Sequence, residues 1–228
     1  MYHRPTMENL QDLKLLRDLY HYKALGYTYF SDVKKPVVSM QTDIDLPDTM
    51  EALMQTAQKC ALCTLANSRK QVVFGEGNPN ADIMFVGEGP GAVEDETGRP
   101  FVGKTGELLS KIIETVLELK REDVYITNIV KCRPPLNRVP SKEEAQKCLP
   151  FLLKQIELVK PKIIITLGAT SYQYLSGDYD SALSKIRGEM IQFSSALLMP
   201  TFHPSFLLRN PSAKKYVFLD MQKVKALL

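Results

Sequence analysis

The sequence lacks any apolar run long enough to cross a membrane, and one of its longest runs is the short segment Ile163–Ile165. A transmembrane helix needs about 20 consecutive apolar residues. An apolar signal region is also missing after Met1, so we do not expect a secreted protein. Repeats and low-complexity tracts are absent, and 44% hydrophobic with 24% charged residues is typical of a globular chain. These absences predict a cytoplasmic protein without a membrane partner.

The length of 228 residues suits one α/β domain of ordinary size with a short appendage. Residues 9–25 place leucines and a tyrosine on one helical face, and the chain then loses its periodicity and gathers Ser, Asp, Lys and Pro. We therefore expect a helical appendage and linker over residues 1–47 and the main domain over residues 48–228.

Charge is nearly balanced over the whole chain, with a net +3, but it is unevenly distributed. Residues 1–119 carry a net charge of −5 and residues 120–228 carry +8. A basic half suits a polyanion such as nucleic acid. A solvated protein surface also explains these charges, so the charge distribution alone does not establish nucleic-acid binding.

Short apolar segments alternate with helical patterns from residue 81 onward. Strands are expected at residues 82–86, 124–130, 162–167 and 196–199, with a further hairpin strand within 186–193. Helices are expected at about 104–120, 141–159 and 169–175, the second behind a capping box that begins at Ser141. Apolar strands that alternate with helices predict a mostly parallel sheet covered on both faces.

Only four cysteines are present, and they form two pairs. Cys60 and Cys63 are spaced C-x2-C, and after a gap of 68 residues Cys132 and Cys148 are spaced C-x15-C. Disulfides are disfavoured in a chain without an export signal, and such a pattern more often binds metal or performs redox chemistry. The helix that starts at Asp48–Glu51 puts the first pair near a helix end, which a thioredoxin-like site would not do.

Four thiolates hold either zinc or an iron–sulfur cluster. The wide spacing of the second pair, and the prolines at 134 and 135 that have no amide donor, favour iron. The spacing does not exclude zinc, and four unrelated buried thiols are a further alternative.

Residues suited to chemistry follow the predicted strands. These strands run into Gly87–Gly91, Asn128, Gly168 and His203–Ser205. Ligands of open α/β sheets bind beyond the carboxyl ends of the strands. We therefore predict one site at this edge, although Gly87–Gly91 is neither a dinucleotide fingerprint nor a Walker loop and also suits a tight turn.

Three further features have both a functional and a structural interpretation. The acidic residues 94–96 either position water or form a solvated loop. The ring of Phe101 stacks on a base or anchors the core. Leu207 and Leu208, followed by Arg209, form an apolar wedge beside phosphate contacts or pack in the core.

Taken together, these segments resemble the motifs of family-four uracil-DNA glycosylases. The matching segments are GEGPG with the following ED, GRPFVGKTG, TNIVKCRPP and HPSFLLR, together with the cysteine spacing. The resemblance covers about residues 50–220. It implies a three-layer αβα sandwich with a four-stranded, mostly parallel central sheet. It also implies hydrolysis of the N-glycosidic bond of uracil in DNA, which leaves an abasic site for base excision repair.

The resemblance assigns roles residue by residue. It implies a [4Fe–4S] cluster on Cys60, Cys63, Cys132 and Cys148. It implies uracil contacts by Glu88, Gly89, Pro90, Phe101, Asn128 and His203, and DNA contacts by Ser205, Leu207, Leu208 and Arg209. His203 and Glu94 are the candidate catalytic residues, with Asp95 in reserve, because Gly89 stands where family-one enzymes have an aspartate.

Two other interpretations stay open. One is a non-catalytic iron–sulfur protein that binds DNA or accompanies a polymerase, and the other is a zinc protein of the same fold. A related branch that traps DNA covalently carries an inserted Lys-Arg-Arg-Ile-His segment, which is absent after Cys132, so we expect no covalent trap. We expect a monomer whose partner is DNA that contains uracil.

Overall fold

The computed structural model describes residues 45–228, which belong to a compact unit that runs to Leu228. The helix expected at residues 9–25 and most of its linker lie outside the described residues, so the boundary at residue 47 stays a prediction. Within residues 45–228, no helix is both long and apolar enough to cross a membrane.

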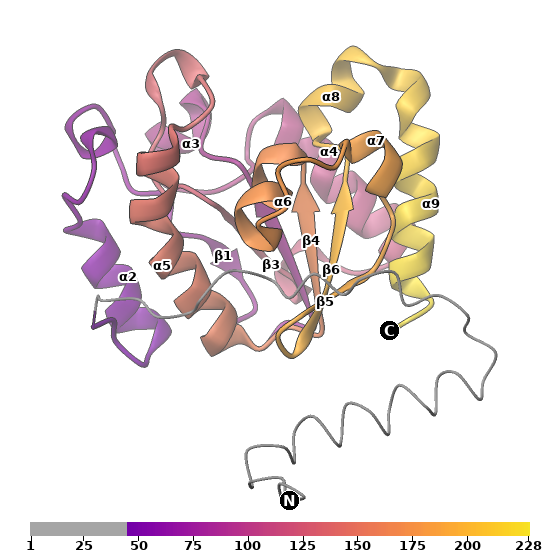
Figure 1. Cartoon of the computed structure of the whole chain (residues 1–228), viewed down its shortest axis with the longest axis horizontal. Coiled ribbons are helices and arrows are strands. Elements are labelled where there is room, and N and C mark those ends of the chain that lie inside the picture. The colour runs from indigo at the N-terminus through magenta and orange to yellow at the C-terminus, as the bar shows by residue number, and fades with distance from the viewer. Residues whose placement is uncertain (1–44) are drawn as a thin grey trace, which may run out of the picture. The chain divides into compact units, whose positions relative to one another are not determined.

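The centre of the fold is a six-stranded sheet with the order β1-β3-β2-β4-β6-β5 (Figure 1). The strands are β1 (Glu76–Gly77), β2 (Ile83–Gly87), β3 (Tyr125–Asn128), β4 (Ile163–Leu167), β5 (Ile191–Phe193) and β6 (Ala196–Thr201). The four middle strands are parallel, and β1 and β5 are antiparallel edges. The predicted four-stranded parallel sheet is confirmed as the centre of a larger, mixed one.

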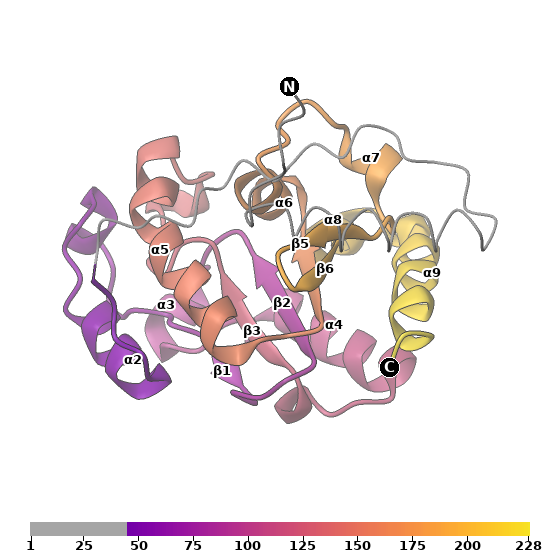
Figure 2. The same ribbon diagram turned by 60° about the horizontal axis from the view of Figure 1, so that its bottom comes forward.

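Helices cover both faces of the sheet (Figure 2). They are α2 (Met50–Gln58), α3 (Ala92–Thr97), α4 (Lys104–Ile112), α5 (Lys142–Val159), α6 (Ala169–Ser176), α7 (Leu183–Ile186), α8 (Pro204–Arg209) and α9 (Lys214–Lys225). Short 3-10 turns add η2 (Thr64–Asn67), η4 (Arg121–Asp123), η5 (Pro135–Asn137) and η6 (Pro211–Ala213), and a π-helical turn η3 (Ile113–Leu117) continues α4.

The strands are apolar on both sides because each side faces a helical layer. Along β2, Met84 and Val86 pack with α5 and α6, whereas Ile83 and Phe85 pack with α4, α8 and α9. Successive side chains of a strand point to opposite faces of the sheet, so a strand between two helical layers needs an unbroken apolar run. The αβα sandwich is confirmed.

Local signals placed the helix starts within a residue or so. Ser141 caps α5, and Glu144 returns the bond to the Ser141 amide, as the capping box predicts. At α2 the cap is Thr49, whose hydroxyl accepts the amide of Ala52, and not Asp48. Asp48 instead pairs with Lys154 on α5.

Candidate active site

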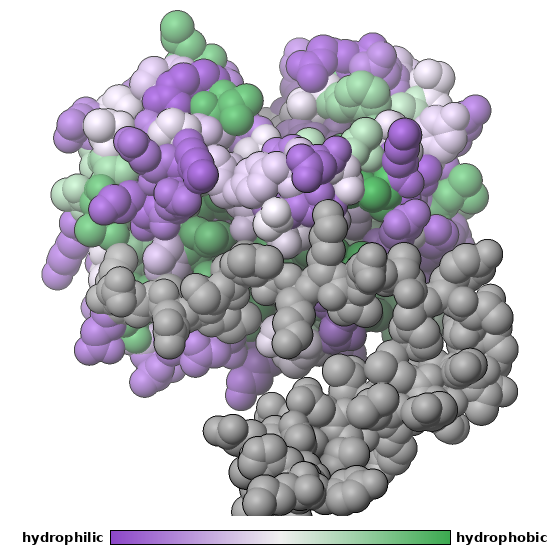
Figure 3. Space-filling model, in the orientation of Figure 1, coloured by the Kyte–Doolittle hydropathy of each residue, from purple (hydrophilic) through white to green (hydrophobic). Residues whose placement is uncertain are grey.

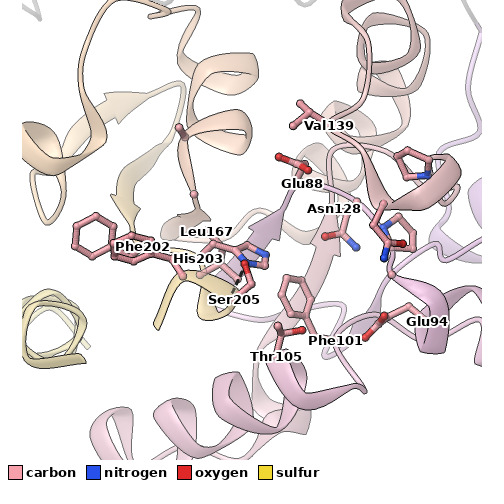
Figure 4. Close-up of a pocket in the computed structure, with 18 of the residues that line it drawn as sticks. Glu88, Glu94, Phe101, Thr105, Asn128, Val139, Leu167, Phe202, His203 and Ser205 are labelled. Carbon is pink, nitrogen blue, oxygen red and sulfur yellow. Dashed lines mark hydrogen bonds between the residues drawn. The ribbon is translucent and has the colours of Figure 1, made fainter. Parts of the chain in front are cut away.

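A cavity of about 770 Å³ lies at the carboxyl edge of the four parallel strands (Figure 4). Its walls come from the segments that follow these strands: Glu88–Gly91 after β2, Asn128 at the end of β3, Gly168 after β4 and His203 after β6. The predicted convergence of these residues at one sheet edge is therefore confirmed.

Asn128 forms part of the cavity wall, and its side-chain oxygen is a candidate ligand contact. Its side chain is buried, and within residues 45–228 its Oδ1 has no hydrogen-bond partner. Gly87 lies directly opposite on β2, where an added Cβ would collide with Asn128 Oδ1 and the Phe101 ring. A buried acceptor without a partner is costly, so this atom is suited to a donor supplied by a ligand.

Phe101 reaches the same space from the loop before α4 (Figure 4). The backbone of Phe101 is left-handed, with φ of 50°. The Phe101 carbonyl lies so close to Gly106 that residue 106 has no room for a side chain. The Phe101 ring lies 5.8 Å from the His203 ring, centroid to centroid, at 39°. The two rings are thus placed to contact one flat ligand from different sides.

His203 is the N-cap of α8, and this position fixes its tautomer. Its Nδ1 accepts the Ser205 amide at 3.1 Å and lies 2.8 Å from Ser205 Oγ. Because Nδ1 is an acceptor, the proton of the neutral ring is on Nε2. Burial, and secondarily the positive charge of Arg209, lower the pKa of His203 to about 4. At neutral pH the side chain is an uncharged N–H donor.

Glu94 and Asp95 are both buried on α3, but their carboxylates accept hydrogen bonds from different segments. Glu94 lines the cavity, and its Oε1 accepts the amides of Val102 and Gly103 at 3.0 Å each. Glu94 therefore holds the loop that carries Phe101. Asp95 does not line this cavity and accepts the amide of Lys70 instead, so it has a structural role.

The expected DNA-binding residues divide into two groups. Ser205 and Arg209 line the cavity. Leu207 was predicted to contact DNA, and this is wrong: α8 turns it inward, where it is completely buried against the sheet with α4 and α9. Leu208, one residue further round the helix, is 45% exposed and does not line the cavity.

The four cysteines line a second, smaller cavity and are all free thiols. The Arg69 guanidinium donates to Cys132 Sγ at 3.4 Å, and the Lys131 amide donates to Cys148 Sγ at 3.3 Å. Burial raises the pKa of the Cys148 thiol to about 12. Among the described residues, no three Cys, His, Asp or Glu side chains are grouped as ligands of a single metal ion.

The comparison with protein families settles the relationship of this chain. Residues 74–222, which contain every segment of the larger cavity, match the model of the uracil DNA glycosylase superfamily. The chain belongs to this superfamily.

Individual relatives are consistent with this assignment. A Type-4 uracil-DNA glycosylase of Thermotoga maritima is 45% identical over 184 residues, which cover 79% of this chain and 95% of the relative. Enzymes of the same description from Saccharolobus solfataricus and Sulfurisphaera tokodaii are 44% and 42% identical; each match covers 79% of this chain and 87% or 85% of the relative.

Several cavity residues were not predicted from the sequence. The loop between β3 and α5 contributes Pro134, Asn137, Arg138 and Val139 to the wall, and α4 contributes Thr105. Pro134 lies inside the matching segment TNIVKCRPP but was given no role, and this segment ends at Pro135, so residues 136–139 carried no signal. The capping box at Ser141 was the one available hint, because it shows where the chain must turn back into a helix.

Proposed function

We propose that this protein removes uracil from DNA by hydrolysing the bond between the base and deoxyribose, leaving an abasic site for base excision repair. The observation that carries the proposal is the unpartnered buried Oδ1 of Asn128, opposite the Nε2–H donor of His203 in one cavity. The substrate is a base turned out of the DNA stack, because an enzyme cannot reach the reacting atoms of a base that remains stacked in the duplex.

Asn128 accounts for recognition of uracil. A side-chain amide offers one acceptor and one donor, and uracil presents N3–H beside the O4 carbonyl. The orphaned Oδ1 accepts N3–H, and the amide nitrogen donates to O4. Cytosine presents the opposite pattern and leaves buried polar groups unpaired, which gives strong discrimination.

Phe101 and the turn after β2 orient the base. The Phe101 ring stacks on the uracil face, while Glu88, Gly89 and Pro90 border the ring edge in the cavity wall. The absence of a side chain at Gly87 leaves the space in which Asn128 and Phe101 approach the backbone.

The leaving group is stabilised by His203. When the C1′–N1 bond breaks, its electron pair passes to uracil and negative charge develops on O2, while the sugar gains oxocarbenium character. The Nε2–H of a neutral imidazole donates to O2, with the amides of the Glu88–Gly89 turn as further donors. A water molecule then adds to C1′, and the proton that it loses neutralises the released uracil anion.

Glu94 is the candidate for positioning that water. One carboxylate oxygen is occupied by two loop amides, and the other lies toward Gly91 in the cavity wall. The same placement crowds the space in which a thymine methyl group would lie.

The test is excision from a labelled oligonucleotide with one uracil, followed by alkaline cleavage of abasic sites. Cleavage at uracil, and none in thymine or cytosine controls, is expected. DNA binding without cleavage would contradict the proposal and favour the non-catalytic DNA-binding alternative.

We further propose that Cys60, Cys63, Cys132 and Cys148 hold a [4Fe–4S] cluster. Four free thiols around one cavity are the donor set for such a cluster, and the two N–H groups aimed at sulfur stabilise thiolate charge. A cluster here would tie the end of α2 to α5 and to the loop after β3. Its role is structural, and free thiols fit the reducing cytoplasm.

Protein purified without oxygen is expected to show an absorption band at about 400 nm and to contain about four iron atoms per chain. Cys148→Ser is expected to lose the band and lower the melting temperature, whereas Ser184→Ala, at an exposed position on α7, is expected to leave both unchanged. A colourless preparation with stoichiometric zinc would overturn the assignment.

A further inference from the structure

A leucine stands almost completely in solvent beside the larger cavity. Leu136 is 96% exposed, the most of any large apolar side chain among residues 45–228, and Val139 on the same loop is 59% exposed. In Figure 1 the loop before α5 rises at the upper left, and Figure 3 shows a hydrophobic group at its tip. An apolar side chain in this position contributes nothing to the core.

The backbone at this point is also unfavourable for the residues it carries. Leu136 has φ of 55° and ψ of 22°, and Asn137 also has φ of 55°. Leucine rarely adopts the left-handed region, which glycine and asparagine tolerate better. Such a conformation persists only where the surroundings enforce it, and it clusters at functional sites.

Hydrogen bonds on both sides of Leu136 enforce the conformation. The Asn137 amide donates to the Pro134 carbonyl at 3.0 Å, and Arg133 Nε donates to Asn137 Oδ1 at 2.8 Å. On the other side, Arg138 donates to both carboxylate oxygens of Glu144, at 2.7 and 2.8 Å. This guanidinium lowers the pKa of Glu144 to about 2, so the Arg138–Glu144 ion pair stays ionised at any physiological pH.

The loop is also placed where a DNA strand would pass. Pro134, Asn137, Arg138 and Val139 line the cavity, so Leu136 projects from the rim beside the opening. Arg133, whose Nε donates to the uncharged Asn137 side chain, puts positive charge at the base of the loop, which suits a phosphate group, whereas the charge of Arg138 is balanced by Glu144. The leucines of α8 are less suitable, since Leu207 is buried and Leu208 lies away from the cavity wall.

We propose that Leu136 enters the base stack of duplex DNA at the place vacated by the extruded base. This rests on the proposed function, because only an enzyme that turns a base out of the helix leaves such a gap. An apolar side chain between bases replaces part of the lost stacking and delays the return of the base. A rigid loop suits this task because no ordering is needed when DNA binds.

The test compares Leu136→Asn with the wild-type chain on three substrates: a U·A duplex, a U·G duplex and a single strand. Asparagine tolerates the left-handed backbone, so the loop conformation is kept while the apolar group is lost. Single-turnover excision from the U·A duplex is expected to fall about 10-fold, from U·G less, and from the single strand less than about 2-fold. Leu136→Met, which stays apolar, is expected to retain excision from the U·A duplex.

Two controls keep the proposal separate from folding and from the proposed function. Leu219→Asn removes a leucine that is 54% exposed on α9 and is expected to leave all three rates unchanged. A 2-aminopurine next to the uracil is expected to brighten on binding to the wild-type chain and less so with Leu136→Asn. Excision from U·A by Leu136→Asn at the wild-type rate would overturn the role of Leu136 alone. Absence of uracil excision by the wild-type chain on every substrate would overturn the proposed function itself.

Discussion

Replacing His203 by alanine is expected to slow uracil excision by about 100-fold or more, the usual effect of removing one donor from an oxyanion site. The loss is expected in the single-turnover rate, with little change in the affinity for uracil-containing DNA, because the Nε2–H bond strengthens as charge develops on O2. His203 packs at the start of α8 and accepts the Ser205 amide, so the melting temperature is measured alongside.

His203→Gln separates the loss of the donor from the loss of the cap. Glutamine keeps a neutral N–H donor and an acceptor oxygen, so its rate is expected to lie between those of alanine and histidine. Near-wild-type excision by His203→Ala, with its melting temperature unchanged, would remove His203 from the catalytic assignment.

The pH dependence follows from the same residue. The pKa of His203 is lowered to about 4, so the ring is already neutral well below its ordinary value of 6.5. The single-turnover rate is therefore expected to show no inflection from His203 between about pH 5.5 and 8, and to fall as the pH drops toward 4. Protonation at low pH puts a hydrogen on Nδ1, which then repels the Ser205 amide. An inflection near 6.5 that disappears in His203→Ala would contradict the neutral-donor role.

Asn128→Asp is expected to reduce kcat/KM for uracil by about 1,000-fold or more. The change removes the amide donor to uracil O4, and a buried polar group of the bound base is then left without a partner. The replacement keeps the shape of the side chain and puts a second oxygen where the amide nitrogen donated to O4. An ionised carboxylate in this buried position is also costly, and it faces the carbonyl oxygen of the base. The measurement is single-turnover excision with uracil opposite guanine.

A second buried polar atom supplies a matched control. Within residues 45–228, Thr166 Oγ1 on β4 is also buried without a hydrogen-bond partner, but Thr166 does not line the cavity. Thr166→Val is therefore expected to leave excision unchanged and to preserve or raise the melting temperature, because an unsatisfied hydroxyl is replaced by a methyl group. Comparable losses of excision in Thr166→Val and Asn128→Asp would show that the Asn128 effect is one of packing and not of base recognition.

Short-range patterns were sufficient for the elements that surround the site. The apolar run of β2 and the capping box at Ser141 depend on neighbouring residues; the capping box was predicted where the structure has it, and the strand within one residue. The two-residue strand β1 was not predicted, because it is too short for any periodicity and exists only through its pairing with β3.

For the site, the sequence by itself determined which residues meet, because consecutive parallel strands present their carboxyl ends at one edge. Asn128 and His203 lie in one cavity for this reason. The tertiary structure alone decided what each side chain faces. Leu207 and Leu208 are adjacent and identical in the sequence, but the rotation of α8 against the sheet buries the first and exposes the second. Leu136, in contrast, follows two prolines in a loop without a sequence signal. Its place in solvent beside the cavity depends on the hydrogen bonds of Asn137 and on the Arg138–Glu144 ion pair. Such placements depend on contacts between elements, which no local pattern of residues encodes.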